Sequence, residues 1–260
     1  MDRQLPTQLT DKSPSRAIDP AARRDIVVGV LLAMFLAALD QTIVAPALPT
    51  IGSSLGNAEY LSWIVTAYLL TATAVTPLYG KLADIRGRRP VIVGAIGIFV
   101  AGSIISALAR SMLALVVGRA IQGIGGGGLA ALAMTVIGDV VAPRERGQYQ
   151  GYISGMWGIA SLAGPIVGGF LAHRLHWSMI FWINLPLAAL AIVVLNNPLK
   201  KLPSVRGRHR LDLQGAGLVI LATISLMLVL TWGGSRYAWT SPQILGLAAI
   251  SLDDNPIATL

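Results

Sequence analysis

The sequence contains no cysteine and few charged residues, and each shortage excludes a class of protein. Without cysteine the chain forms no disulfide, holds no iron–sulfur cluster through thiolates and performs no thiol chemistry. Charged residues make up 12% of the 260 residues, whereas an ordinary soluble domain has about 25%. Hydrophobic residues make up 54%, and apolar runs recur from Ile26 to near the C-terminal end. This composition favours an all-α polytopic membrane protein that is embedded in a lipid bilayer.

The net charge of +8 does not indicate a nucleic-acid partner, because the basic residues stand between the apolar runs and form no patch on a polar domain. A helix needs about 20 mostly apolar residues to cross a bilayer. We expect seven such spans, at residues 26–48, 61–79, 91–109, 112–140, 149–171, 179–195 and 213–232. An eighth run, at 244–252, is too short to cross as a helix.

The basic residues predict the orientation of these spans. Sixteen of the 20 Lys and Arg residues lie in segments 1–25, 80–90, 141–148 and 196–212, and three lie in the alternate loops. The positive-inside rule therefore places the N-terminus in the cytoplasm. We expect a disordered cytoplasmic tail at 1–25, since it is polar, mixed in charge and contains three prolines. It lacks the apolar region of a cleaved signal peptide, so the first span is expected to act as an uncleaved signal-anchor. The other expected units are a six-helix bundle at 26–197, a basic cytoplasmic loop at 198–212, and a further helix with a partial eighth segment at 213–260.

Two charged residues lie well inside predicted spans. Asp40 lies eight residues before the expected outer end of its span at Leu48, and Arg119 lies eight residues after Ser111, near the outer end of its own span, which places both about 12 Å below the outer surface. Charges at membrane depth are costly and face a protein interior, so we expect the two to share one. Their spans also begin successive three-helix units, and transporters built from inverted triplets bind substrates where the repeats meet. A purely structural ion pair, or an arginine that snorkels outward, are the alternatives.

Two glycine-rich stretches lie within predicted helices, at residues 122–128 and 164–169. Glycine in a helix costs up to about 1 kcal/mol relative to alanine, which is tolerable where another helix or a substrate approaches closely. Pro165 in the second stretch favours a kink. Close helix packing without any role in gating is the alternative for both. No strand or lysine accompanies them to form a phosphate-binding loop.

The segment 80–90 is expected to connect the second and third spans on the inner face. Gly87 permits a tight turn there. The arginines of this segment hold it on the inner face, and the negative charge of Asp84 adds nothing to that anchoring. We therefore expect Asp84 to contact arginines or a helix N-terminus across the bundle. Such a contact would latch one conformation. A solvated loop charge is the alternative.

Together these stretches resemble the major facilitator superfamily and, within it, the fourteen-span drug:proton antiporters of the EmrB/QacA type. The resemblance covers about residues 26–235, and its motifs occur in the family's order and spacing. Its elements are a first-span motif at 39–49, an inner-loop latch motif at Gly80, Asp84, Gly87, Arg88 and Arg89, a fourth-span motif at 119–123, an antiporter motif at Gly151, Gly164, Pro165, Gly168 and Gly169, and a second-span pattern with Trp63 and Tyr68. Two positions depart from the family: Ala160 stands where glycine is usual, and Ser178 stands where arginine is frequent. We expect the fold to tolerate both.

The resemblance implies efflux of small hydrophobic or cationic compounds in exchange for protons, across a bacterial inner membrane. The proton gradient supplies the energy and no cofactor is expected. Asp40 is the implied proton site and Arg119 its modulator, because burial favours the neutral acid and a nearby arginine favours the carboxylate. Gln122, Trp63, Tyr68 and Trp157 are the expected cavity or substrate groups. We expect Asp40 to lie on one wall of a cavity whose opposite wall belongs to a second six-helix half.

That second half does not follow within the 260 residues, and we expect a truncation, frameshift or fragment. An inactive half-transporter, or a structural partner of a separately encoded second half, is therefore one alternative function. A proton-coupled metabolite transporter is another. No enzyme and no metal site is expected. His173 and His176 have no evident third ligand, and Ser154 and Ser161 have no local His/Asp partners for a nucleophile.

Overall fold

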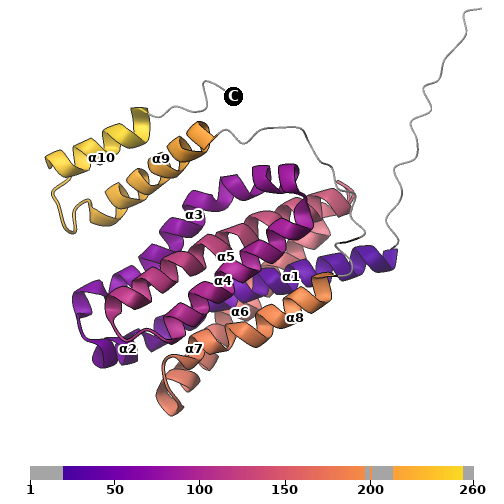
Figure 1. Ribbon diagram of the computed structural model, residues 1–260, viewed down its shortest axis with the longest axis horizontal. Coiled ribbons are helices and arrows are strands. Elements are labelled where there is room, and N and C mark those ends of the chain that lie inside the picture. The colour runs from indigo at the N-terminus through magenta and orange to yellow at the C-terminus, as the bar shows by residue number, and fades with distance from the viewer. Residues whose placement is uncertain (1–19, 197–199, 201–212, 254–260) are drawn as a thin grey trace, which may run out of the picture.

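The computed structural model describes residues 20–196, 200 and 213–253, and its regular elements are helices (Figure 1). Seven segments in this part of the chain are long and apolar enough to cross a membrane, which confirms the predicted all-α membrane fold. The helices are α1 (Pro20–Ile43), α2 (Leu48–Leu55), α3 (Leu61–Arg86), α4 (Arg88–Ala107), α5 (Met112–Val140), α6 (Arg146–Arg174), α7 (Met179–Trp182), α8 (Asn184–Asn196), α9 (Leu213–Trp232) and α10 (Pro242–Asp253).

The first span differs from its prediction at both ends. Helix α1 already begins at Pro20, so residues 20–25 are helical and the prediction of a disordered tail was wrong for them; residues 1–19 lie outside the described part. It ends at Ile43, before a 3-10 turn at Ala45–Ala47 and the short helix α2. Pro46 and Pro49 explain this break, because proline cannot donate the backbone hydrogen bond that would continue the helix.

The connection between α3 and α4 is much tighter than predicted. Residues 80–86 continue α3, and α4 begins at Arg88, so a single residue separates the two helices. That residue, Gly87, has φ +91°, a conformation that glycine adopts without steric cost. The predicted turn at Gly87 is confirmed, whereas the other residues of the predicted connecting loop at 80–90 belong to the two helices.

The sixth span is broken near its N-terminal end. Helix α7 ends at Trp182 and α8 begins at Asn184. Pro186 provides the local reason, since its missing N–H removes the bond that would continue the helix past Trp182. The break sets Asn184 at the start of α8, where its side chain is fully buried.

Helices α9 and α10 lie beside the main bundle as an antiparallel pair, on the side of α3 (Figure 1). The indole rings of Trp63 on α3 and Trp232 on α9 meet edge to face, with 6.1 Å between centroids. Helix α10 has 12 residues, too few to cross a bilayer. Apart from Lys200, the predicted basic loop at 198–212 lies outside the described residues, as do residues 254–260.

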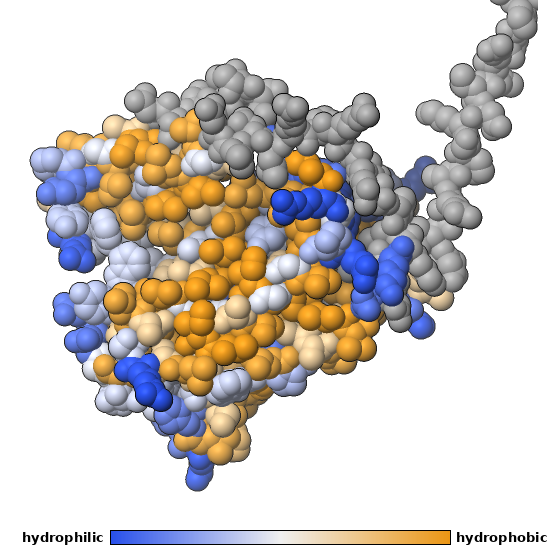
Figure 2. Space-filling model, viewed as in Figure 1, coloured by the Kyte–Doolittle hydropathy of each residue, from blue (hydrophilic) through white to orange (hydrophobic). Residues whose placement is uncertain are grey.

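The surface has the layering expected of a membrane protein. Figure 2 shows a broad hydrophobic face between hydrophilic ends. Large apolar side chains such as Leu162, Ile166 and Val193 are more than 70% exposed, which a bilayer accommodates and water does not. The interior contains two separate hydrophobic clusters. One cluster includes the buried apolar residues of α1 between Ile26 and Ala38, together with Phe99 of α4. The other cluster includes Ile43 and Phe181.

Candidate functional site: a buried polar layer

A layer of polar side chains lies where the two hydrophobic clusters meet. On α1, Asp40 follows the last residue of one cluster, Ala38, and precedes the first residue of the other, Ile43. The polar residues of the other helices also stand between members of the two clusters. The layer consists of Asp40, Ser103, Arg119, Gln122 and Asn184. None of the five is more than 1% exposed. The apolar clusters therefore separate these polar groups from both ends of the bundle.

Asp40 is the centre of this layer. Its Oδ2 atom accepts a hydrogen bond from Arg119 Nη1 at 2.6 Å, within an ion pair. Its Oδ1 atom accepts from Gln122 Nε2 at 2.6 Å and from Asn184 Nδ2 at 2.8 Å. The three hydrogen bonds to this carboxylate are thus donated by side chains of α5 and α8.

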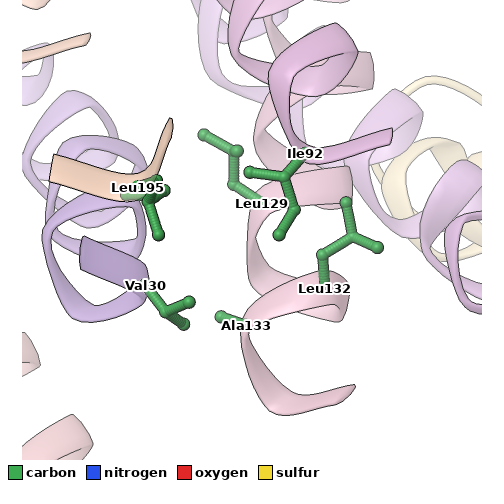
Figure 3. A pocket seen from close by; sticks show the side chains of 7 residues that line it. Val30, Ile92, Leu129, Leu132, Ala133 and Leu195 are labelled. Atoms are coloured by element: carbon green, nitrogen blue, oxygen red, sulfur yellow. The ribbon is translucent and has the colours of Figure 1, made fainter. Parts of the chain in front are cut away.

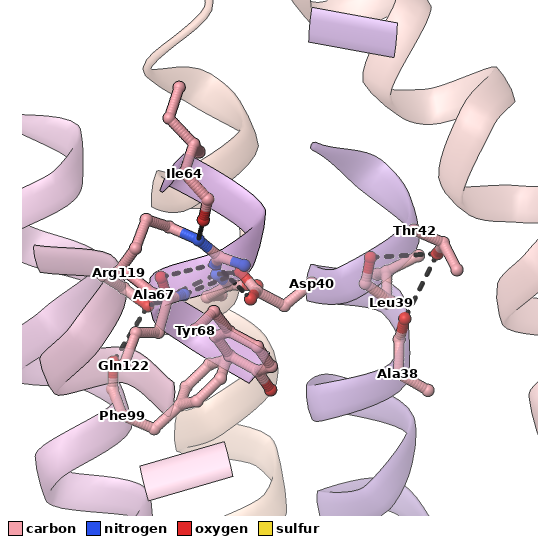
Figure 4. A network of polar contacts seen from close by, with 12 residues as sticks. Ala38, Leu39, Asp40, Thr42, Ile64, Ala67, Tyr68, Phe99, Arg119 and Gln122 are labelled. Atoms are coloured by element: carbon pink, nitrogen blue, oxygen red, sulfur yellow. Dashed lines mark hydrogen bonds and ion pairs between the residues drawn. The ribbon is translucent and has the colours of Figure 1, made fainter. Parts of the chain in front are cut away.

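Arg119 is held from several sides (Figure 4). Its Nε atom donates to the Ile64 carbonyl oxygen of α3 at 3.1 Å, and Nη1 also donates to Gln122 Oε1 at 2.8 Å. The guanidinium carbon lies 4.3 Å from the centroid of the Tyr68 ring and 5.9 Å from that of Phe181. These contacts fix the guanidinium on Asp40, and they exclude the alternative in which Arg119 snorkels to the outer surface.

Ser103 and Asn184 complete the layer, and sequence reasoning missed both. Ser103 Oγ donates to the Phe99 carbonyl at 3.0 Å and accepts from Gln122 Nε2 at 2.8 Å. Asn184 Nδ2 donates to Asp40 and, at 3.3 Å, to Ser103. Uncharged polar residues within apolar spans were the available signal. The proline two residues after Asn184 marked the helix start that directs this side chain inward.

The expectation that Asp40 and Arg119 share an interior is confirmed, whereas the expected cavity between this half and a second one stays a prediction. Asp40 is 0% exposed although no second six-helix half is present. Helices α5 and α8 of this chain contribute the groups that bond to it. A small gap elsewhere in the bundle is lined by seven aliphatic side chains, which include Val30, Leu132 and Leu195 but not Asp40 (Figure 3).

Comparison with known proteins agrees with this architecture. The family model described as Major Facilitator Superfamily matches residues 30–252. The chain belongs to the major facilitator superfamily. The human organic anion transporter MFSD10 (TETRAN) shares the fold with a TM-score of 0.62 at 23% identity, over 87% of this chain and 59% of that one.

Curated relatives in the superfamily include bacterial and fungal proteins. The chain is 41% identical to the multidrug transporter protein MdtP of Bacillus subtilis over 87% of its own length and 42% of that protein's. It is 38% identical to the efflux pump FUS6 of Gibberella moniliformis, over 95% of its length and 46% of the relative's. It is 39% identical to the MFS-type efflux pump LUC4 of a Fusarium species, over 93% and 48%. The chain thus spans less than half the length of these superfamily relatives.

Of the four predicted cavity groups, the structure brings two to Asp40 and Arg119. Gln122 bonds to both, and the Tyr68 ring lies under the guanidinium. Trp63 instead packs against Trp232 of α9. Trp157 is 36% exposed on α6 and belongs to neither hydrophobic cluster.

The glycine-rich stretches of α5 and α6 lie in close contact with neighbouring helices. A Cβ atom on Gly123 or Gly127 of α5 would overlap the backbone of α3, and one on Gly125 would overlap the backbone of α4. In the antiporter motif of α6, Gly164 and Gly168 face Thr42 and Ile43 of α1 in the same way. Gly151 and Gly169 of that motif face open space, and Pro165 lies within the continuous helix α6. The close neighbours are thus other helices.

Ala160, which stands where the family usually has glycine, also packs closely against α1. Ala160 is fully buried, and its carbonyl oxygen accepts a hydrogen bond from Thr42 Oγ1 at 2.9 Å. Ser178, the second departure, is 9% exposed and its Oγ lies 2.9 Å from His176 Nδ1. The fold accommodates both substitutions, as expected.

The predicted latch residues form a different contact from the one expected. Asp84 pairs locally with Arg88, four residues on, at 2.7 Å, and does not reach across the bundle. Arg88 makes the cross-helix contact, because its Nε donates at 2.9 Å to Asp139 near the end of α5. Arg89 Nη2 donates to Asn196 Oδ1 of α8 at 2.7 Å. Gly80 lies within α3 with nothing near the position of a Cβ atom.

Histidines do not assemble a metal site in the described residues, where no group of three His, Cys, Asp or Glu side chains is placed to hold an ion. His173 is exposed in the last turn of α6. His176 is exposed beyond α6, and its ring lies 5.1 Å from that of Trp177.

Proposed function

We propose that this chain forms the proton-coupling half of a transporter that exports small hydrophobic or cationic compounds in exchange for protons. The observation that carries the proposal is the buried Asp40–Arg119 pair, at 2.6 Å and with neither side chain more than 1% exposed. Relatives named as a multidrug transporter and efflux pumps support export as the direction. A fourteen-span protein of a bacterial inner membrane, with a cytoplasmic N-terminus, is the form that we propose.

The physical logic is an exchange of partners at Asp40. In the described conformation, donors from α5 and α8 favour the carboxylate. Movement of α1 against these helices removes donors from a group that remains desolvated, and this favours protonation. Asp40 therefore binds a proton in one conformation and releases it in the other. The proton gradient supplies the energy, and the exchange uses no cofactor.

The test is substrate-stimulated proton release from inverted membrane vesicles that contain this chain together with its second half. Asp40→Asn is expected to abolish the release, since an amide side chain, unlike a carboxylate, does not take up a proton near neutral pH. Asp25→Asn is the matched control, because Asp25 lies on the same helix with its side chain 51% exposed. The control is expected to keep wild-type release. Equal release from Asp40→Asn and the wild type, at equal amounts in the membrane, would sink the proton role of Asp40.

We further propose that transport requires a second six-helix half, supplied by more of the same protein or by a separate chain. The support is that the chain spans 42% and 46% of two relatives while matching them at 41% and 38% identity. Reading the nucleotide sequence downstream for a continuation is the simplest test. Substrate export by vesicles that contain the 260-residue chain alone would contradict this requirement.

A further inference from the structure

The two amides in the buried polar layer are held differently. Gln122 uses both ends of its amide: Oε1 accepts from Arg119, while Nε2 donates to Asp40 and to Ser103. Asn184 uses one end. Its Nδ2 donates to Asp40 and Ser103, but its carbonyl oxygen is buried and accepts no hydrogen bond from any described residue. A buried carbonyl oxygen without a donor is unfavourable, and its position beside Asp40 calls for an explanation.

We propose that Asn184 senses the protonation state of Asp40 by rotating its amide. In the described conformation the amide nitrogen donates to the carboxylate. After a half-turn about the Cβ–Cγ bond, the amide oxygen accepts the O–H of the protonated acid. This inference rests on the proposed function, which makes Asp40 the proton-binding group.

The surrounding groups leave Asn184 as the acceptor. A proton on Asp40 Oδ2 would face Arg119, which has donors and no acceptor. A proton on Oδ1 faces Gln122 and Asn184. If Gln122 rotated, it would lose its bond from Arg119 and turn its oxygen away from that donor. Rotation of Asn184 costs a bond of 3.3 Å to Ser103, and it gives the unpartnered oxygen a donor.

The same rotation carries the signal to other helices. Asn184 is the first residue of α8, directly after the break that separates α8 from α7. Ser103, which the amide releases, lies on α4. Protonation of Asp40 on α1 therefore changes a contact between α8 and α4. Asn184 acts here as a positioning residue, because the proton itself forms its bond with Asp40.

Infrared difference spectroscopy tests the inference on the 260-residue chain in lipid, with the asparagine side-chain carbonyls labelled with carbon-13. The low-pH minus neutral-pH spectrum is expected to contain two changes. A carboxylic-acid band appears and is absent in Asp40→Asn. A labelled asparagine carbonyl band moves to lower frequency at the same pH, because the oxygen gains a hydrogen bond, and this movement is absent in Asn184→Leu.

Two further variants make the assignment secure. Asn57→Gly alters an asparagine with φ 54° in the segment between α2 and α3, and glycine suits that backbone; it is expected to keep the shifting band. If Asn184→Leu does not insert into the membrane, the smaller polar variant Asn184→Ser replaces it.

The outcomes separate the two proposals. An acid band that depends on Asp40, together with asparagine bands that do not move, overturns the role of Asn184 and leaves Asp40 as the proton site. Absence of any acid band that depends on Asp40 overturns the proposed function itself. A shifting asparagine band that survives in the Asn184 variants also overturns the inference.

Discussion

Asp40 and Arg119 are 79 positions apart in the sequence, and their charged atoms lie 2.6 Å apart in the interior of the bundle. The desolvation of two charges offsets much of their attraction, so such a pair contributes little net stability compared with apolar residues of the same size. Removal of one partner is a different matter, because the remaining charge is then buried alone. This asymmetry makes the helix packing around the pair sensitive to the loss of either charge.

The first prediction concerns the cost of breaking this pair. Arg119→Met leaves the Asp40 carboxylate without its counter-charge, and we expect the free energy of unfolding to fall by about 3–5 kcal/mol. Adding Asp40→Asn removes the uncompensated charge, so the double variant is expected to recover part of the loss. Reversible unfolding of the purified chain in mixed detergent micelles measures both.

A surface pair provides the control. Arg23 and Glu145 also form an ion pair, at 2.8 Å, but their side chains are 33% and 44% exposed. Arg23→Met is expected to cost less than about 1 kcal/mol, because water screens the charges that remain. Equal losses for Arg23→Met and Arg119→Met would contradict the role given to burial.

The second prediction concerns helix contact at glycine. A methyl group on Gly127 of α5 would overlap the α3 backbone at Ala72, which no side-chain rotation relieves. We expect Gly127→Ala to lower the free energy of unfolding by about 1–3 kcal/mol, although alanine is the better helix former. Gly158→Ala on α6 is the control, since nothing lies near its added methyl group. It is expected to be neutral or stabilising by up to about 1 kcal/mol. The same unfolding assay measures both variants. If Gly127→Ala leaves the free energy of unfolding unchanged, the close contact between α5 and α3 is refuted.

The residues that the sequence predicted correctly are those with a formal charge inside an apolar span and the glycine at which a helix must end in a tight turn. Asp40 and Arg119 stand out in apolar runs, and counting residues from the span ends placed them at one depth. Gly87 stands out because a tight reversal needs a positive φ. These signals are local, so one sequence is sufficient to find them.

The remaining parts depend on which helix faces which, and the sequence carries weaker signals for that. Ser103 and Asn184 are uncharged, and serine or asparagine in a span does not by itself identify a partner. Asp139 was missed because the arginine that reaches it, Arg88, also has Asp84 within its own segment. The enclosure of Asp40 follows from the rotation of α1 about its own axis, which composition does not specify.

The third prediction concerns the aromatic contact that holds α9 to the bundle. The rings of Trp63 and Trp232 meet edge to face, a geometry worth about 0.5–1.5 kcal/mol beyond buried area. A double-mutant cycle with Trp63→Ala and Trp232→Ala is expected to give a coupling energy in that range. The cycle that pairs Trp157→Ala with Trp232→Ala is the control and is expected to give none. Independent effects of Trp63 and Trp232 would show that the contact does not hold α9 in place.

The fourth prediction concerns the end of the bundle at which α3 and α5 end and α4 begins, called the inner end after the proposed orientation, where Arg88 contacts both Asp84 and Asp139. Either carboxylate alone still pairs with Arg88, so Asp84→Asn and Asp139→Asn are each expected to change little. Together they leave Arg88 unpaired, and the inner end of the bundle is expected to open more often. The lack of native cysteine allows a direct measurement with Ala83→Cys, since Ala83 on α3 is 1% exposed.

A water-soluble maleimide applied to inside-out vesicles is expected to label Ala83→Cys several-fold faster in the double variant than in either single variant. Arg88→Gln should reproduce the double variant, because it removes the shared partner of both carboxylates. Gly147→Cys on α6, which faces open space, is the control and is expected to react at one rate in every background. If the two single variants each give the full increase, Arg88 needs both carboxylates at once and the contacts do not substitute for each other. If no combination changes the rate, these ion pairs do not hold the inner end closed.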